Sequence, residues 1–130
     1  MMTKKVPMRL VATNVETGAV VANRVDVAAK RVERAVGLLT RAGLRDGEAL
    51  FITPCRGVHT WFMRFTIDML ALNEAGVVVD AVSDLRPWRI RLPRAGAVNV
   101  LELPAGSLSR TKTEVGHRIE MKLAPAWEAR

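Results

Sequence analysis

A cysteine and a histidine four residues apart are the first candidates for chemistry in this sequence. Cys55 and His59 could form a thiolate and imidazole pair, in which the histidine activates the thiol as a nucleophile. In an extended chain the two residues lie about 13 Å apart, so contact between them requires a turn at Arg56-Gly57, which the glycine permits. A small buried cysteine beside a hydrogen-bonded histidine is the commoner arrangement. Nucleophilic catalysis at this pair is therefore an alternative and not the leading prediction.

The spacing of Cys55, His59 and Met63 also resembles the ligand loop of a blue-copper site. A strand over these residues would spread the three ligands apart. The second histidine that such a site needs upstream is missing, because the other histidine of the chain is His117. Zinc-site spacings, phosphate loops and nucleotide fingerprints are missing as well. The sequence therefore predicts neither a metal nor another cofactor.

An arginine-rich stretch, DLRPWRIRLPRAG, forms the second candidate for a site. Trp88 stands in it between Arg86 and Arg89. An indole among guanidinium groups can stack on a base or a sugar and hold a phosphate. In the structural alternative, Trp88 folds down over the core and the arginines stay in water or pair with Asp84 and Glu102.

A long alternating stretch must position these residues. From Trp61 to Leu72 every second residue is apolar, which predicts a strand with one apolar side. A four-residue loop and a run of valines follow, which predicts a β-hairpin. The other side carries polar residues, namely Thr60, Arg64, Thr66 and Asp68. This side either satisfies itself, with an arginine such as Arg64 neutralising Asp68, or lines a ligand groove.

Short strands and one helix account for the rest of the chain. Met8–Asn14 and residues 19–27 indicate a first hairpin, and an amphipathic helix is expected from Ala28 to near Gly43. Further strands are expected at residues 48–53, 98–103 and 117–123, with room for a short helical turn within SLSRTKTEVG. No βαβ alternation and no repeat is evident. We predict a mainly β fold (α+β with one short amphipathic helix), an antiparallel β-barrel or sandwich of about six or seven strands.

Size and composition indicate a single domain over residues 1–130, with a core at about residues 8–123. Of the 130 residues, 49% are hydrophobic, enough to form a core without a disulfide or a metal. The single cysteine excludes an internal disulfide and is typical of a reducing compartment. Pro7 and Arg9 interrupt any signal-peptide core, and no apolar stretch is long enough to span a membrane. We expect a cytoplasmic protein.

The net charge of +7 favours anionic partners such as nucleic acid, phosphates or acidic lipid headgroups. The basic residues are dispersed along the chain, and no run of five or six forms a basic tail. Charge by itself therefore supports nucleic-acid binding only weakly, because a basic surface also serves solubility.

Four motifs occur in an order that resembles the DUF192 family, whose members are small proteins of uncharacterised function. They are RAVGLL at residues 34–39, CRGVHTWFMRFTID at 55–68, LRPWR at 85–89 and VLELPAG at 100–106. The resemblance extends from about Val25 to about Met121. It implies a compact, mostly β fold and supplies no reaction. Thr66 departs from the family pattern, which usually has proline before the Ile-Asp pair.

The leading prediction is a domain that binds a small or anionic ligand, such as a small anion or a carbohydrate-like molecule. The groove would lie between the Cys55–Asp68 segment and the Arg86–Arg94 connection, where polar residues face an arginine and tryptophan loop. The candidate ligand-binding residues are Cys55, His59, Thr60, Arg64, Asp68, Arg86, Trp88 and Arg89. The alternatives are an enzyme that uses Cys55 with His59, a nucleic-acid-binding module and a protein-interaction module.

Overall fold

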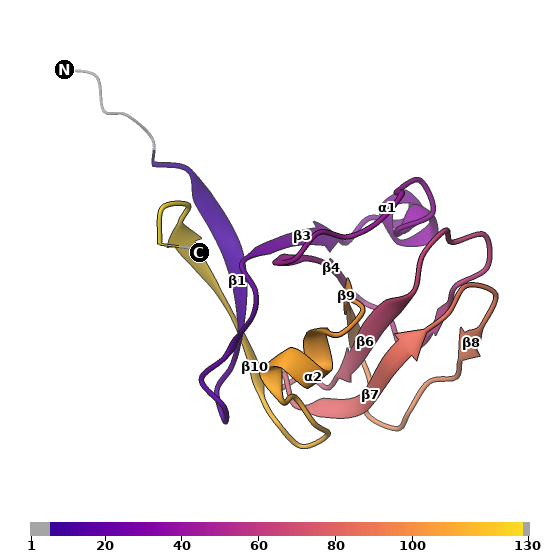
Figure 1. The fold of residues 1–130 in the computed structure, drawn as a ribbon. Helices are drawn as coiled ribbons and strands as arrows, with labels where there is room; N and C mark the ends of the chain where they lie inside the picture. Colours follow the sequence, from indigo (N-terminus) through magenta and orange to yellow (C-terminus); the bar gives the residue numbers. More distant parts are fainter. Residues whose placement is uncertain (1–5, 129–130) are drawn as a thin grey trace.

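The structure, a computed structural model, describes residues 6–128 and is mainly β within that range. Within that range, ten strands form three sheets and are accompanied by two short helices (Figure 1). The elements are β1 (Met8–Asn14), β2 (Val20–Ala22), β3 (Arg24–Ala28), α1 (Arg31–Val36), β4 (Glu48–Ile52), β5 (Val58–His59), β6 (Ile67–Leu72), β7 (Val78–Leu85), β8 (Ile90–Arg91), β9 (Asn99–Pro104), α2 (Ser107–Thr111) and β10 (Ile119–Pro125). The predicted mainly β, sandwich-like class is confirmed, with more and shorter strands than expected.

The central sheet has five strands in the order β3-β4-β9-β6-β7. Its neighbours are antiparallel except for β3 and β4, which are parallel with Arg24 opposite Glu48 and Ala28 opposite Ile52. Since parallel strands need a crossover, α1 and its flanking loops form that connection. The expectation that the chain has no βαβ unit was wrong. The first strand of this unit, β3, lies within the residues 19–27 that the sequence pairs with Met8–Asn14.

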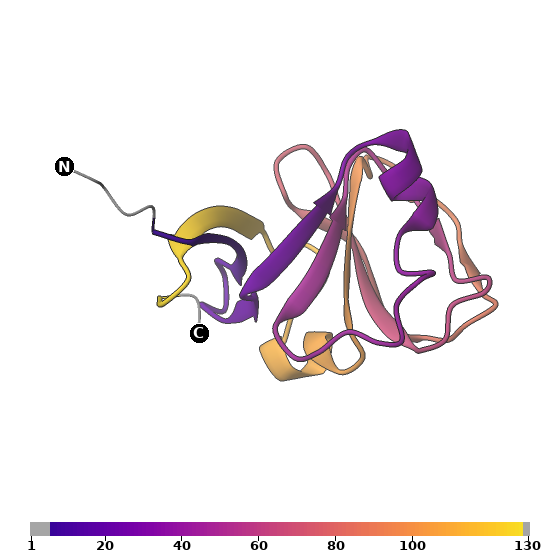
Figure 2. The ribbon, with the colours of Figure 1, turned by 90° about the horizontal axis from the view of Figure 1, so that it is seen from above.

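The second sheet has the order β10-β1-β2 and extends to one side of the central sheet (Figures 1 and 2). β1 pairs with β10 over its whole length, but it pairs with β2 only at Ala12 and Thr13. The chain leaves this sheet at Asn23, whose N–H binds the carbonyl of Gly47. The predicted first hairpin therefore exists only between β1 and β2, and residues 24–28 belong to the central sheet.

The central sheet has an apolar core on each face, so β6 is buried on both sides along its whole length. One core surrounds Leu70 and Leu101 and is continuous with the second sheet and α2. The other core surrounds Met69 and Val100 and contains Leu38, which follows α1. A strand between two covered faces must bury whatever polar residue it carries, which decides the environment of Asp68 and Glu102.

The predicted hairpin of β6 and β7 is confirmed, but its first strand begins at Ile67 and not at Trp61. Residues 61–66 form turns instead, and Phe62 has a positive φ of 66°. The prediction of a strand over these residues was wrong. The preceding strand, β5, pairs antiparallel with β8 and not with the central sheet, so the chain must turn before β6 begins. Asn73 closes the hairpin, since its Oδ1 accepts the N–H groups of Ala75 and Val77.

The amphipathic helix is shorter than predicted. α1 covers six residues, and Gly37, with a φ of 49°, ends it well before Gly43. At its start, the Glu33 carboxylate accepts the N–H of Lys30 at 2.9 Å. Among the described residues, no helix has the length and apolar character to span a membrane.

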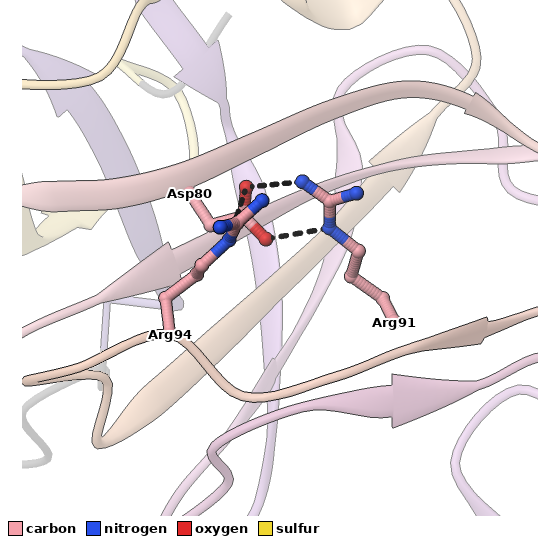
Figure 3. Close-up of polar contacts among 3 residues, drawn as sticks. All are labelled: Asp80, Arg91 and Arg94. Carbon is pink, nitrogen blue, oxygen red and sulfur yellow. Dashed lines mark hydrogen bonds and ion pairs between the residues drawn. The ribbon is translucent and has the colours of Figure 1, made fainter.

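An ion pair fixes the connection that carries β8 (Figure 3). The Asp80 carboxylate, nearly buried on β7, accepts two hydrogen bonds of 2.8 Å from Arg91, and Arg94 lies 3.8 Å away. The suggested pairing of these arginines with Asp84 and Glu102 was wrong. The hydrogen bond from Arg91 holds the pKa of Asp80 below its ordinary value of 3.8.

Replacing Arg91 with glutamine is expected to lower the free energy of unfolding by about 1–2 kcal/mol at neutral pH, because a nearly buried carboxylate loses a bidentate partner. The pair stabilises the fold above the unfolded-state pKa of Asp80, and this contribution is lost as the pH falls through the lower folded-state value. Urea unfolding of both proteins should therefore show a difference that narrows in acid. Arg94→Gln is the control, since the loss of its longer, exposed contact with Asp80 should change the free energy of unfolding little.

Candidate functional site

A cavity of about 140 Å³ lies between the end of α1, the Cys55–Met63 segment and the central sheet. Its walls are apolar at Leu38, Ile52 and Met63. Four groups able to ionise also line it, namely Arg34, Cys55, His59 and Glu102. We refer to this space as the Glu102 cavity, because that residue is its most unusual feature.

Glu102 lies in the middle of β9, opposite Leu50 on one neighbouring strand and Met69 on the other. Only 6% of the residue is exposed, and within residues 6–128 its Oε2 has no hydrogen-bond partner. Burial among apolar neighbours raises its pKa from 4.5 to about 7, while the charge of Arg41 acts weakly in the opposite direction. This carboxyl group therefore changes its protonation state near neutral pH.

Cys55 is half-buried beside the same cavity. Its thiol donates a hydrogen bond to the carbonyl of Gly57 at 3.1 Å. Burial raises the pKa of the thiol, the charge of Glu102 raises it further, and the Gly57 contact and Arg34 oppose these effects. The thiol is thus held in its protonated form at neutral pH, which is the reverse of the activation that a nucleophile requires.

His59 and Arg34 form the outer part of the cavity. The His59 ring is exposed and lies 5.1 Å from the ring of Trp61, between centroids. Arg34, on α1, donates a hydrogen bond of 3.4 Å to the carbonyl of Pro54 and so joins the helix to the segment that carries Cys55. The cavity therefore has a buried carboxyl group on its inner side and a guanidinium and an imidazole group on its outer side.

Gly57 sets the distance between this segment and β8. A Cβ atom at Gly57 would lie 2.6 Å from the carbonyl oxygen of Arg91 and 3.0 Å from the nitrogen of Pro93. Only glycine allows this close approach of two backbones. The turn that the sequence permitted at Arg56-Gly57 thus serves the pairing of β5 with β8, and it leaves Cys55 and His59 on the wall of one cavity.

Thr60 is fully buried and ties two loops together. Its hydroxyl donates to the carbonyl of Arg86 at 2.6 Å and accepts the N–H of Arg89 at 2.9 Å. Among the eight candidate residues, Thr60 is one whose polar group is already occupied by the protein itself. Its contacts hold the Arg86–Arg89 turn against the Cys55–Met63 segment.

Thr60→Val should lower the free energy of unfolding by about 1–2 kcal/mol, because the shape is retained while the Arg89 N–H loses its acceptor. Thr60→Ser keeps the hydroxyl and should cost less. Urea unfolding followed by circular dichroism would distinguish the two variants, and equal losses would contradict a role for the hydroxyl.

Asp68 is also fully buried, on the face of β6 opposite to the Glu102 cavity. One of its carboxylate oxygens accepts the N–H of Asp84 at 3.0 Å, and the other accepts the N–H of Leu108 at 2.9 Å. The expectation that an arginine such as Arg64 neutralises it was wrong. Two backbone donors satisfy the carboxylate, and Arg64 is exposed.

The structure distributes the eight candidate residues over separate places. Cys55 and His59 share the Glu102 cavity, Thr60 and Asp68 bind backbone groups, and the remaining four are exposed: Arg64, Arg86, Trp88 and Arg89. The groove expected between the two segments corresponds to a mostly apolar hollow of about 220 Å³, lined by residues 57–59 and 90–93. Of the eight, His59 alone lines it.

Sequence reasoning missed Glu102 and Arg34 as site residues. A lone acidic residue inside an apolar strand, as in VLELP, was the available signal for Glu102, since a charge there must be buried or the strand must have an exposed face. Arg34 gave no signal, because exposed helices carry many arginines. In the part of the chain that the structure describes, no three His, Cys, Asp or Glu side chains are grouped to hold a metal ion.

Comparison with known proteins identifies the same family as the four sequence motifs. The model of the DUF192 family, described as Uncharacterized ACR, matches residues 12–121. A UPF0127 protein of Pyrococcus abyssi is 38% identical over 103 residues, covering 75% of this chain and 85% of that protein. A UPF0127 protein of Pyrococcus furiosus is 33% identical over 112 residues, covering 82% and 94%.

Two crystal structures share the fold. A protein of unknown function from Novosphingobium aromaticivorans superposes with a TM-score of 0.73 at 24% identity, covering 85% of this chain and 82% of that one. A Sinorhizobium meliloti protein, described only as a candidate transcription regulator, gives 0.74 at 20% identity, covering 92% and 98%. At these identities the likeness concerns the fold alone. The family match over most of the chain shows that this protein belongs to the DUF192 family.

Proposed function

We propose that this protein binds a small ligand in the Glu102 cavity. The observation that carries the proposal is a carboxyl group that is 6% exposed, lines a cavity and has an oxygen without a hydrogen-bond partner in the described residues. An unpaired buried polar group costs stability, so a fold that retains one has a use for it or compensates for it elsewhere. A ligand that donates a hydrogen bond to Glu102 would remove that cost.

The size and lining of the cavity define the class of ligand. A volume of about 140 Å³ suits a molecule of about six heavy atoms, since an engineered cavity of similar size in another protein binds benzene. Leu38, Ile52 and Met63 would contact its apolar part. Glu102 would accept a hydrogen bond from an amine, an amide or a hydroxyl group. In this proposal the ligand lies in the Glu102 cavity and not in the predicted groove beside Arg86–Arg94, and it is a hydrogen-bond donor and not an anion.

Protonation of Glu102 would tune such binding. The carboxyl group loses its proton as the pH passes about 7, so an ammonium ligand should bind more tightly above that value. A neutral alcohol of the same size should show a weaker dependence, because it can donate to either form of the carboxyl group.

A thermal-shift screen with small amines, amides and alcohols at about pH 6 and about pH 8 tests the proposal. We expect at least one amine to raise the unfolding midpoint more at the higher pH, and Glu102→Gln to abolish that increase. Glu74→Gln, an exposed carboxylate in the β6–β7 turn, is the matched control. The proposal fails if no compound moves the midpoint or if the glutamine variant at 102 responds as the parent does.

The alternative function is an enzyme that uses Cys55 with His59. It is favoured by one observation, namely that both residues share a cavity with Glu102. The raised pKa of the thiol weighs against it. Iodoacetamide labelling against pH separates the two ideas. A thiol that alkylates readily below pH 7 would support the enzyme, whereas reaction only above the ordinary thiol pKa of 9.0 would contradict it.

A further inference from the structure

Large apolar side chains are exposed at the end of the molecule where β5 pairs with β8. They come from the turn after β5 and from the connection that carries β8, and their exposed fractions range from 47% to 69%: Trp61, Phe62, Trp88, Ile90 and Leu92. We refer to these five residues as the aromatic tip. In Figures 1 and 2 this end of the fold lies opposite β1 and β10. Clusters of this kind mark surfaces that contact another apolar phase.

The backbone holds the aromatic tip in place. Phe62 and Trp88 both have positive φ values, of 66° and 64°, which is uncommon for aromatic residues. Thr60 fixes both turns, since its N–H binds the carbonyl of Arg89 at 2.8 Å and its carbonyl accepts the N–H of Trp88 at 3.0 Å. The rings of Phe62 and Trp88 lie 4.7 Å apart. Strain that the surrounding bonds maintain is typical of functional positions.

Arginines lie within two residues of the aromatic tip in the sequence. Arg64, Arg86 and Arg89 are exposed, and within residues 6–128 none of the three forms an ion pair. Asp84 is the exposed acidic residue nearest to them in sequence. The arginines of the same connection that do pair, Arg91 and Arg94, are bound to Asp80 on β7 (Figure 3). The free charge at this end is therefore cationic, and the whole chain carries +7.

We propose that the aromatic tip docks on an anionic lipid bilayer surface. Tryptophan and phenylalanine partition into the region between headgroups and acyl chains, and arginines beside them bind lipid phosphates. Ile90 and Leu92 favour this partner over nucleic acid, because aliphatic side chains have no ring to stack on a base. The turn after β5 and the connection that carries β8 reach the interface, whereas the central sheet and the β10-β1-β2 sheet stay in water. This docking is independent of the Glu102 cavity.

Sedimentation of the full chain with vesicles tests the proposal. We expect binding to vesicles that contain phosphatidylglycerol, little binding to pure phosphatidylcholine, and at least about tenfold weaker binding when the salt is raised to about 0.5 M. Tryptophan fluorescence should shift to the blue on binding. Trp127→Phe should retain that shift, since Trp127 follows β10 at the other end.

Two leucines provide a matched pair of variants. Leu92, in the aromatic tip, is 69% exposed, and Leu123, on β10, is 68% exposed. Leu92→Ser should weaken vesicle binding by about fivefold or more, whereas Leu123→Ser should leave it unchanged. Both side chains are exposed, so neither change should unfold the protein, and circular dichroism would verify this. Glu102→Gln should also bind vesicles normally.

Three results would overturn the proposal. One is no sedimentation with anionic vesicles. Another is equal binding by the Leu92→Ser and Leu123→Ser proteins. The third is a protein that does not bind vesicles but binds a single-stranded RNA probe, and loses this binding in Leu92→Ser. That result would assign the aromatic tip to nucleic acid.

Discussion

The free energy of unfolding of the unsubstituted chain is expected to fall by about 3 kcal/mol between pH 4.5 and about 7, and replacing Glu102 with glutamine should abolish this fall. The carboxyl group has a higher pKa in the folded state than in the unfolded state. Between the two values the folded chain holds a proton that the unfolded chain releases. Stability from this group is therefore complete below pH 4.5 and lost as the pH rises to about 7.

Urea unfolding at about pH 4.5 and about pH 8 measures this effect. The glutamine side chain is neutral at both pH values. The free energy of unfolding of the variant should therefore lie within about 1 kcal/mol of the parent value at the lower pH and exceed it by about 3 kcal/mol at the higher pH. Glu74→Gln, which removes an exposed carboxylate, should leave the pH dependence of the parent intact. Parallel curves for the parent and the Glu102 variant would show that Glu102 ionises normally, and the cavity would lose its distinguishing feature.

The stability of Glu102→Gln bears on function because glutamine cannot become an anion and so cannot bind a ligand through a negative charge. If Glu102 is kept at a cost in stability, removing its charge should stabilise the protein and abolish ligand binding together. Such a trade between stability and activity is common at binding sites. A variant that is more stable and still binds the same ligand would place the site elsewhere.

Replacing Asp68 with asparagine should cost about 2–4 kcal/mol of unfolding free energy at neutral pH. The carboxylate of this fully buried residue accepts two backbone N–H groups, from Asp84 and from Leu108. An amide has one oxygen, so its NH₂ group would face one of these two donors. The lost bond would release either the end of β7 or the first turn of α2.

Asp84→Asn is the matched control. Asp84 lies one hydrogen bond away from Asp68, is exposed and has a φ of 55°. Asparagine tolerates this backbone conformation well, so we expect a change within about 0.5 kcal/mol. The two asparagine substitutions remove the same charge from neighbouring positions. Thermal and urea unfolding would compare the stability of the two variants. Similar stability of both variants would contradict the structural role of Asp68.

Local patterns in the sequence predicted much of the fold. The alternation and turn chemistry around Asn73 identified the β6–β7 hairpin, and the apolar run VLEL identified β9. Four motifs in order identified the family. The parallel pairing of β3 with β4 could not be predicted in the same way, because a strand of five residues has the same pattern whichever partner it finds.

The β-rich class, the family and the residue types available for chemistry follow from the sequence, because periodicity, turn residues and motif order act over short stretches of chain. Which of these residues meet depends on the tertiary structure. It grouped Cys55 and His59 with Glu102, bound Thr60 and Asp68 to backbone groups, and left Trp88 exposed. The physical reason is that burial and hydrogen-bond partners depend on segments far apart in sequence. Asp68 and Glu102 are both acidic residues on buried strands, and they differ because two N–H groups reach one carboxylate and a cavity faces the other.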